Sequence, residues 1–271
     1  MTYDASESSI QGGEPVELYE FRRGSIVDRY TSTDSDIVVD GDTYLAATLK
    51  RSELDTSGER ARSAVRITCA RNFLIAELFR VSPPPYVVAF TLRRVHRSDL
   101  TDVAVIWVGR VLNAEWRGAT ADLSCEPVTT SMKRMGLRRK YQRQCPLVLY
   151  GQGLGQCNVN RDVHKTTTTV TGISGQVLTV AALTSKPWAG GFVEWEAPDG
   201  SVEYRFIESF TGLDLKLSQA FHGLAVSDTV TVSPGCNHTQ AMCNATYSNG
   251  DNYGGFPFTP LKNPFDGTPV Y

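Results

Sequence analysis

Residues 103–128, VAVIWVGRVLNAEWRGATADLSCEPV, carry the clearest fold signal in this chain of 271 residues. β-branched and aromatic side chains dominate two runs, 103–118 and 119–128, and such side chains are enriched in strands. Similar runs, separated by turn residues, occupy 16–23, 37–47, 63–70 and 86–95. Asp40-Gly41 stands between two apolar runs, which is a common short-hairpin signal. The sequence therefore predicts an antiparallel β domain over 16–128, after a polar leader at 1–15.

One helical segment is expected inside this domain. In NFLIAELF (72–79), Phe73 and Ala76 stand at near-helical spacing with Leu78 or Phe79, and the prolines at 83–85 would end a helix. Cys69 and Cys125 lie in apolar strand-like runs, so we expect both thiols to be buried in the core. The four tryptophans also stand in strand-like contexts and are expected in a core or a subunit interface: Trp107, Trp116, Trp188 and Trp195.

A second small β module is predicted at about 163–233, inserted into a C-terminal region that spans 129–271. Short runs rich in Thr and Val are joined there by Gly, Pro-Asp-Gly and Ser-Gly turns. Val193 and Trp195 alternate with Glu194 and Glu196, which indicates a sheet with one solvated face. The fold class predicted for the whole chain is mainly β.

Composition and charge narrow the classes of partner and compartment. Hydrophobic residues make up 41% of the chain and charged residues 21%, as in an ordinary globular protein. The net charge of -2 gives no global reason to expect a nucleic acid or an anionic membrane. We find neither a basic start followed by an apolar run nor a span long enough to cross a membrane. A cytoplasmic setting is therefore expected, in which the six cysteines are thiols or metal ligands.

Four of these cysteines stand in glycine-rich segments on either side of the β module. Cys145 and Cys157 form a C-x11-C pair, and Cys236 and Cys243 form a C-x6-C pair. The apolar residues of 234–258 are too sparse and irregular for a helical or strand face, so something other than packing must hold that segment. A module whose two ends meet would bring the pairs together and make a split four-thiolate metal site. From the residues alone, zinc, an iron–sulfur cluster and unconnected thiols all stay open.

The order of these motifs carries a family resemblance. GLRRKYQRQCPLVLYGQGLGQCNVN (136–160), then a β module, then CNHTQAMCNATYSNGDNYGGFPFTP (236–260) resembles the C-terminal half of the phage tail-tip or baseplate hub family. The family includes the tail-tip L protein of lambda and the hub proteins of siphophage-like gene transfer agents. ELYEF, DRYTS, WVGRV and CEPV look like the β-rich hub half that accompanies it. The resemblance covers about 15–265, and the sequence departs from a common form of the motif in the extra loop GQGLG before Cys157.

The resemblance implies a structural virion protein, not an enzyme, at the tip of a long non-contractile tail. It would form a homo-oligomeric ring, preferably a trimer, between the distal tail protein and the central fibre or receptor-binding assembly, after assembly in the cytoplasm of a bacterial host. It also implies a [4Fe-4S] cluster held by Cys145, Cys157, Cys236 and Cys243. Tyr253, Phe256 and Phe258 are expected to shield that cluster from water.

The basic run near the first cysteine pair has two interpretations. Lys140 and Arg143 belong to it together with Lys133, Arg134, Arg138 and Arg139. Such a run is usually a solvated face, and here it would also offset the negative charge of a thiolate-bound cluster. Transient contact with genomic DNA is the alternative.

Other chemistry has weaker signals. GQGLG (151–155) lacks the spacing of a dinucleotide-binding loop, so it is expected to be a loop that carries Cys157. The four histidines, 96, 164, 222 and 238, show no metalloprotease spacing, and no serine elbow is present. No catalytic residue is therefore expected. The alternatives are a zinc-stabilised tail assembly protein and a Cys-dependent hydrolase in which Cys145 works with His164.

Overall fold

The computed structural model of this chain describes residues 3, 7–9, 13–54, 64–81, 83–133, 136, 140–198, 200–221 and 223–260. The chain divides into two compact units, Met1–Arg134 and Met135–Tyr271. No helix in the described ranges is long and apolar enough to cross a membrane.

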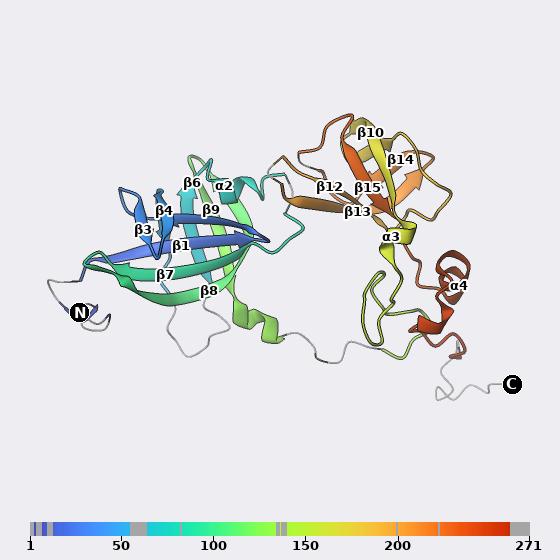
Figure 1. The fold of residues 1–271 in the computed structure, drawn as a ribbon, viewed down its shortest axis with the longest axis horizontal. Coiled ribbons are helices and arrows are strands. Elements are labelled where there is room, and N and C mark those ends of the chain that lie inside the picture. Colours follow the sequence, from blue (N-terminus) through green and yellow to red (C-terminus); the bar gives the residue numbers. More distant parts are fainter. Residues whose placement is uncertain are drawn as a thin grey trace. The chain divides into compact units, whose positions relative to one another are not determined.

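Unit 1 is built on a nine-stranded sheet (Figure 1). Its strands are β1 (Pro15–Arg23), β2 (Ile26–Thr31), β3 (Ile37–Val39), β4 (Asp42–Ala46), β5 (Leu49–Arg51), β6 (Val65–Ala70), β7 (Ala89–His96), β8 (Asp99–Arg117) and β9 (Thr120–Pro127). They lie in the order β3-β4-β2-β1-β7-β8-β9-β6-β5. The predicted β domain is present, but the expectation of a purely antiparallel sheet was wrong, since β2 and β4 pair in parallel. The chain reverses twice between those strands, once before β3 and once in the β3–β4 hairpin.

The turn chemistry of that hairpin matches its sequence signal. Val39 pairs with Asp42, and Asp40 and Gly41 between them have φ values of 52° and 83°. Positive φ at both central residues is the backbone that Asp-Gly favours in two-residue hairpins. β2 and β5 were not predicted, because β2 mixes charged and apolar residues and β5 has only three residues.

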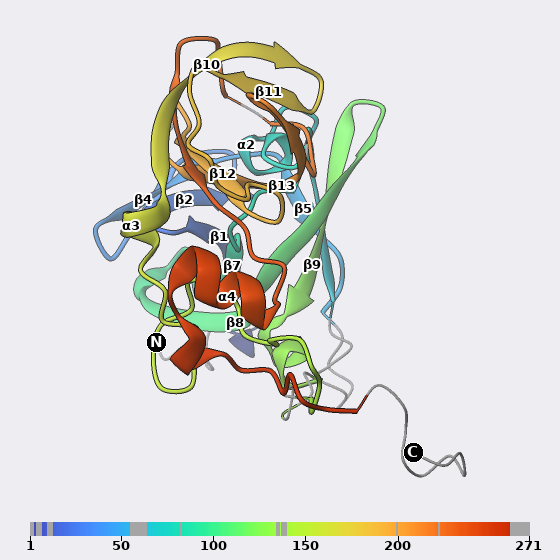
Figure 2. The same ribbon diagram turned by 90° about the vertical axis from the view of Figure 1, so that its right-hand side faces the viewer.

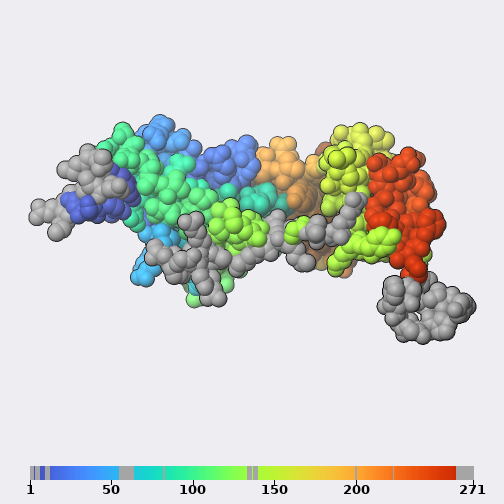
Figure 3. Space-filling view, turned by 90° about the horizontal axis from the view of Figure 1, so that it is seen from below, coloured from blue at the N-terminus to red at the C-terminus, as the bar shows by residue number. Residues whose placement is uncertain are grey.

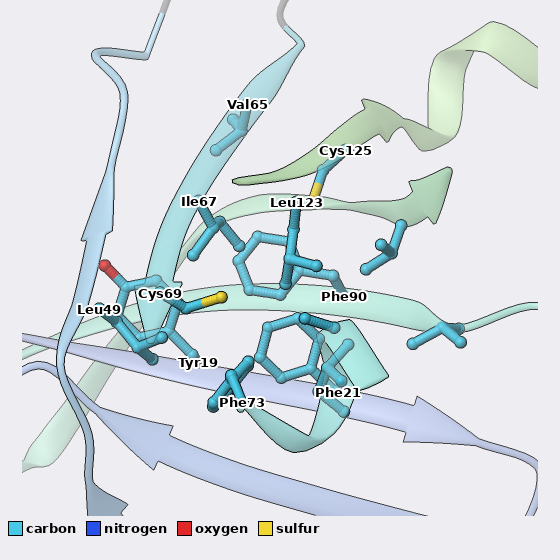
Figure 4. Close-up of a cluster of buried hydrophobic side chains, with 14 of the residues drawn as sticks. Tyr19, Phe21, Leu49, Val65, Ile67, Cys69, Phe73, Phe90, Leu123 and Cys125 are labelled. Carbon is cyan, nitrogen blue, oxygen red and sulfur yellow. The ribbon is translucent and has the colours of Figure 1, made fainter. Parts of the chain in front are cut away.

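The main core of unit 1 is rich in aromatic rings and includes both cysteines of this unit (Figure 4). Phe21 stacks on Phe90 with ring centroids 4.9 Å apart. Cys69 and Cys125 are each 2% exposed, which confirms their expected core role. Trp107 is buried and Trp116 packs partly buried against the same core. The helix α2 (Leu74–Glu77) contributes Ile75 and Ala76 to this core, and it is shorter than the predicted 72–79.

Unit 2 contains a closed six-stranded barrel with the order β10-β11-β14-β13-β12-β15. The strands are β10 (Thr166–Ser174), β11 (Val177–Val180), β12 (Phe192–Glu196), β13 (Val202–Thr211), β14 (Asp214–Leu217) and β15 (Thr229–Ser233). Trp188 and Trp195 are buried in its core, as predicted. Val193 and Trp195 face inward while Glu194 and Glu196 face out, so the expected alternation is confirmed. Closure into a barrel was not predicted.

The remaining elements of unit 2 lie on the two chain segments outside the barrel. They are α3 (Arg161–His164), α4 (Gln240–Tyr247) and the 3-10 turn η3 (Gly250–Asn252), while another 3-10 turn, η2 (Val128–Lys133), follows β9 in unit 1. The expectation that 234–258 has no helical face was wrong, because α4 forms there. The Thr239 hydroxyl accepts the amide of Met242 as an N-cap. Cys243 and Tyr247, four residues apart, are its buried side chains, and this single pair was too short a signal to detect.

Candidate metal centre

The barrel topology brings the two cysteine segments to the same place. β10 and β15 are antiparallel neighbours, with Thr166 paired to Val232. The chain therefore enters β10 beside the point where it leaves β15. Cys157 precedes the start of β10 and Cys236 follows the end of β15, so both pairs of cysteines lie at the same end of the barrel. Figure 2 shows the red α4 segment beside the yellow-green segment that leads into β10.

All four predicted ligands line one small cavity of about 20 Å³, formed by residues of unit 2. Cys145 and Cys157 come from the segment before the barrel, and Cys236 and Cys243 from the segment after it. The rest of the lining is Leu147, Leu149, Val159, His238, Thr239, Tyr247, Asn252 and Tyr253. The cavity thus has four sulfurs within a mostly apolar and aromatic surround. In the space-filling view, the yellow-green and red surfaces of this unit adjoin (Figure 3).

The segment around Cys145 is tied to the C-terminal segment by main-chain hydrogen bonds. The Cys145 amide donates to the His238 carbonyl at 2.9 Å, and the Phe256 amide donates to the Gln142 carbonyl at 2.8 Å. The Tyr253 hydroxyl donates to the Arg143 carbonyl at 2.6 Å. Because these groups belong to segments about a hundred residues apart in sequence, their bonds fix one cysteine pair against the other.

Three of the four sulfurs accept an N–H group. The His238 amide lies 3.3 Å from Cys236 Sγ, and the Gly254 amide lies 3.4 Å from Cys145 Sγ. The side-chain amide of Asn249 lies 3.8 Å from Cys157 Sγ. Donors to sulfur stabilise the thiolate form, which is the form that binds metals. Cys243 differs, since its thiol donates to the Asn249 carbonyl at 3.2 Å.

Two tyrosines and a glycine hold the turn that leads from β15 to Cys236. The Tyr150 hydroxyl donates to the Pro234 carbonyl at 2.8 Å, and the Tyr247 hydroxyl donates to the Gly235 carbonyl at 2.6 Å. A Cβ on Gly235 would overlap the backbone of Ala189 and its neighbours, so the turn needs glycine here. Burial raises the pKa of Tyr150 to about 12, which keeps this phenol a neutral donor.

The thiols of the second pair resist ionisation when no cation is present. Burial, together with the nearby Cys157, Cys236 and Cys145, raises the pKa of Cys243 to about 11. Burial also raises the pKa of Cys236, with further increases from Cys157 and Cys145, although the His238 amide acts in the opposite direction. The four sulfurs therefore act on one another, and four thiolates in this cavity require a positive charge among them.

The donor set can be tested against the candidate groups. A single tetrahedral zinc, with Zn–S bonds of about 2.3 Å, would hold its sulfurs about 3.8 Å apart. Among the described residues, no group of three or more His, Cys, Asp or Glu side chains is gathered closely enough to hold one ion. A cluster spaces its thiolates more widely, because each binds a different iron. The cavity of about 20 Å³ has room for about one water molecule. Four thiols around one cavity are a donor set that suits zinc as well as an iron–sulfur cluster.

The expected aromatic shield is only partly present. Tyr253 lines the cavity, and Phe256 stacks on Tyr141 with ring centroids 3.8 Å apart. Phe258 is 93% exposed, so its expected shielding role was wrong. The missed residues are Tyr150, Tyr247 and Asn249, whose contacts depend on the barrel bringing distant segments together.

The basic run is described only in part. Arg134, Arg138 and Arg139 lie outside the described residues. The Arg143 guanidinium donates to the Pro257 carbonyl at 3.1 Å, while Lys140 is exposed. Arg143 therefore helps to hold the two segments together.

The described histidines lie at different distances from the cysteine cavity. His164 contacts the Tyr247 ring, with centroids 4.9 Å apart, and it does not line the cysteine cavity. His238 lines that cavity, where its backbone contacts Cys145 and Cys236. His96 is buried in unit 1, and His222 lies outside the described residues.

Comparisons with known proteins show similarity to a phage protein family and to a chain of a virion. Residues 186–263, which include Cys236 and Cys243, match the family model described as "Phage conserved hypothetical protein BR0599". An uncharacterized protein of Xylella fastidiosa (strain 9a5c) is 28% identical over 204 residues, which cover 71% of this chain and 41% of that protein. This chain thus spans less than half the length of that relative.

One solved structure is similar over nearly the whole chain. It is a chain from the virion of a native gene transfer agent particle, with a TM-score of 0.79 and 17% sequence identity. The match covers 98% of this chain and 95% of that chain. At this identity the likeness concerns the fold, and this protein therefore has the mainly β fold of a chain found in a virion.

Proposed function

We propose that this protein is a structural subunit of a phage-type virion that serves as a hub at the tip of a long non-contractile tail. The fold shared with a chain of a gene transfer agent particle and the match of residues 186–263 to a phage family support a virion role. The motif order of the cysteine segments supports the position at the tail tip. In that position the protein would link the distal tail protein to the central fibre or receptor-binding assembly.

We further propose that Cys145, Cys157, Cys236 and Cys243 hold a [4Fe-4S] cluster. The observation that carries this proposal is that both cysteine pairs, separated by the whole barrel in sequence, line one cavity. The cluster would supply four metal–thiolate bonds and thereby cross-link the two segments. The chain's own groups fix the sulfurs, direct N–H donors at three of them and exclude water with Leu147, Leu149 and Tyr247.

Metal analysis of anaerobically purified protein tests the cluster. We expect a brown protein with broad absorbance near about 400 nm and about four irons and four sulfides per chain. Cys145→Ser, Cys157→Ser, Cys236→Ser and Cys243→Ser should each lower the iron content and destabilise the cysteine segments of unit 2, because a ligand is lost. Cys125→Ala is the matched control: it should keep the iron and cost about 1 kcal/mol or somewhat more of folding free energy.

Two outcomes would contradict the cluster in different ways. A colourless folded protein with one zinc per chain would show that the metal is zinc, and it would support the same four cysteine ligands. A folded, metal-free protein in which all four thiols alkylate freely would remove the metal site altogether.

Assembly into a ring would require exposed apolar surface, and β8 carries some. Val105, Val108 and Leu112 on this strand are 58%, 43% and 46% exposed. Such side chains on a sheet are ready contacts for another copy or a partner. Electron microscopy of virions carrying a label on this subunit should show the label at the distal tail tip, in three copies. A label on the capsid or along the tail tube would reject the hub position.

A further inference from the structure

We propose that Asn249 is a positioning residue for the metal centre. Asn249 joins Cys157 to Cys243 and sets the reduction potential of the bound cluster. This inference rests on the proposed cluster. It deepens that proposal by assigning a role to a residue that is not a ligand.

The backbone of Asn249 is fixed against α4. Ser248 ends the helix in the left-handed conformation, with φ 48°, and its amide donates to the Asn244 carbonyl at 3.2 Å. The Asn249 amide donates to the Cys243 carbonyl at 3.1 Å. The Asn249 carbonyl in turn accepts the Cys243 thiol at 3.2 Å. A metal-bound Cys243 would be a thiolate with no proton to donate, so the bond from the Asn249 amide to the Cys243 carbonyl is the main-chain contact that would remain.

The side chain of Asn249 reaches the other cysteine segment. Its Nδ2 donates to the Cys157 carbonyl at 2.6 Å and lies 3.8 Å from Cys157 Sγ. Its Oδ1 accepts Asn252 Nδ2 at 2.8 Å. Because Asn252 occupies the acceptor oxygen, the donor group of the amide is held toward Cys157. Asn249 is half-buried, so water competes only weakly for these bonds.

These contacts connect one ligand from each cysteine pair. The Cys157 contacts tie the segment before the barrel to the segment after it, at the cavity itself. An N–H group beside a thiolate also offsets negative charge, and reduction of a cluster adds negative charge. Removing that donor should therefore loosen Cys157 and make the cluster harder to reduce. A carboxylate in its place should have a larger effect than a neutral side chain.

Asn249→Asp is the sharpest test, because it keeps the shape, removes the donor and adds a negative charge. The affinity for the cluster, measured by competition with a chelator, should be about 10- to 100-fold lower than in the unmodified protein, as for other residues that support metal ligands. The midpoint potential, followed by EPR during a redox titration, should become more negative. Asn249→Ala should shift the potential in the same direction by a smaller amount.

Asn160→Asp is the matched control. It adds the same charge three residues from Cys157, where Asn160 is exposed and its side-chain oxygen accepts the Asp162 amide at the start of α3. An aspartate keeps that N-cap. We expect its potential and iron retention to match those of the unmodified protein. Equal potentials and equal retention in Asn249→Asp and Asn160→Asp would overturn the proposal.

A measurement without metal separates this inference from the cluster itself. Asn249→Ala should raise the alkylation rate of Cys157 in the metal-free protein relative to that of Cys145, measured site by site by mass spectrometry. If the unmodified protein binds no iron, the cluster fails, and unchanged alkylation of Cys157 would then reject the positioning role too. Faster alkylation of Cys157 in an iron-free Asn249→Ala protein would support the positioning role without the cluster.

Discussion

At the scale of single residues, the cysteine cavity depends on groups that carry no thiol. Gly235 stands directly before Cys236, where the backbone of Ala189, Gly190 and Gly191 leaves no space for a Cβ. Its carbonyl accepts the Tyr247 hydroxyl, and its amide donates to the Pro187 carbonyl at 2.8 Å. Gly235 therefore fixes the positions of the end of the barrel, helix α4 and Cys236 relative to one another.

Substitution of Gly235 should move Cys236 without removing any of the four cysteines. Gly235→Ala should lower the free energy of unfolding of unit 2 by about 1–3 kcal/mol, because the new methyl group forces backbone apart. It should also lower iron content, although all four cysteines remain. Gly136→Ala, where a Cβ meets nothing within 4 Å, is the control and should be near neutral. Denaturant unfolding and iron assays give both values, and a Gly235→Ala protein as stable as the control would contradict this role for the turn.

At the scale of elements, the pairing of β10 with β15 decides where the cysteines meet. Eleven residues separate Cys145 from Cys157, and a whole barrel separates Cys157 from Cys236. Closing the loop costs little extra for its length, because the entropy of closure grows only with the logarithm of chain length. The barrel core, with Trp188, Leu178 and Leu215 at most 1% exposed, supplies the packing that holds its ends together. The short helix α4 then turns Cys243 back toward the same cavity.

At the scale of the whole molecule, the two units have separate sources of stability. The described core clusters of unit 1 draw only on residues before 135, and the barrel cluster draws only on residues after it. The barrel has its own buried core, so it does not depend on iron for its hydrophobic packing. The cysteine segments outside the barrel are held mainly by hydrogen bonds and by contacts among the residues that line the cavity.

Fragments should therefore respond differently to metal removal. A fragment of residues 1–134 should unfold cooperatively at a temperature that a chelator does not change. In a fragment of residues 135–271, a chelator should leave the barrel folded and expose 142–160 and 236–258 to protease, because those segments lose their cross-link. Limited proteolysis with mass spectrometry follows both. Loss of the barrel in the same step as the cysteine segments would show that the cluster and barrel form one cooperative unit.

The sequence by itself determined the mainly β class, most strands of both units, the core placement of Cys69 and Cys125, and the set of cysteines that line the cavity. The strands depend on local patterns such as alternation and turn pairs, and the cysteines were found from their spacing within each of two segments. Only the tertiary structure decided the parallel β2–β4 pair, the closure of the barrel, the helix α4 and the contacts of Gly235, Tyr150 and Asn249. The barrel and these contacts depend on residues distant in sequence, whose distances are fixed by the completed packing, whereas α4 rests on a local cap and a single buried pair that is too short a signal to detect.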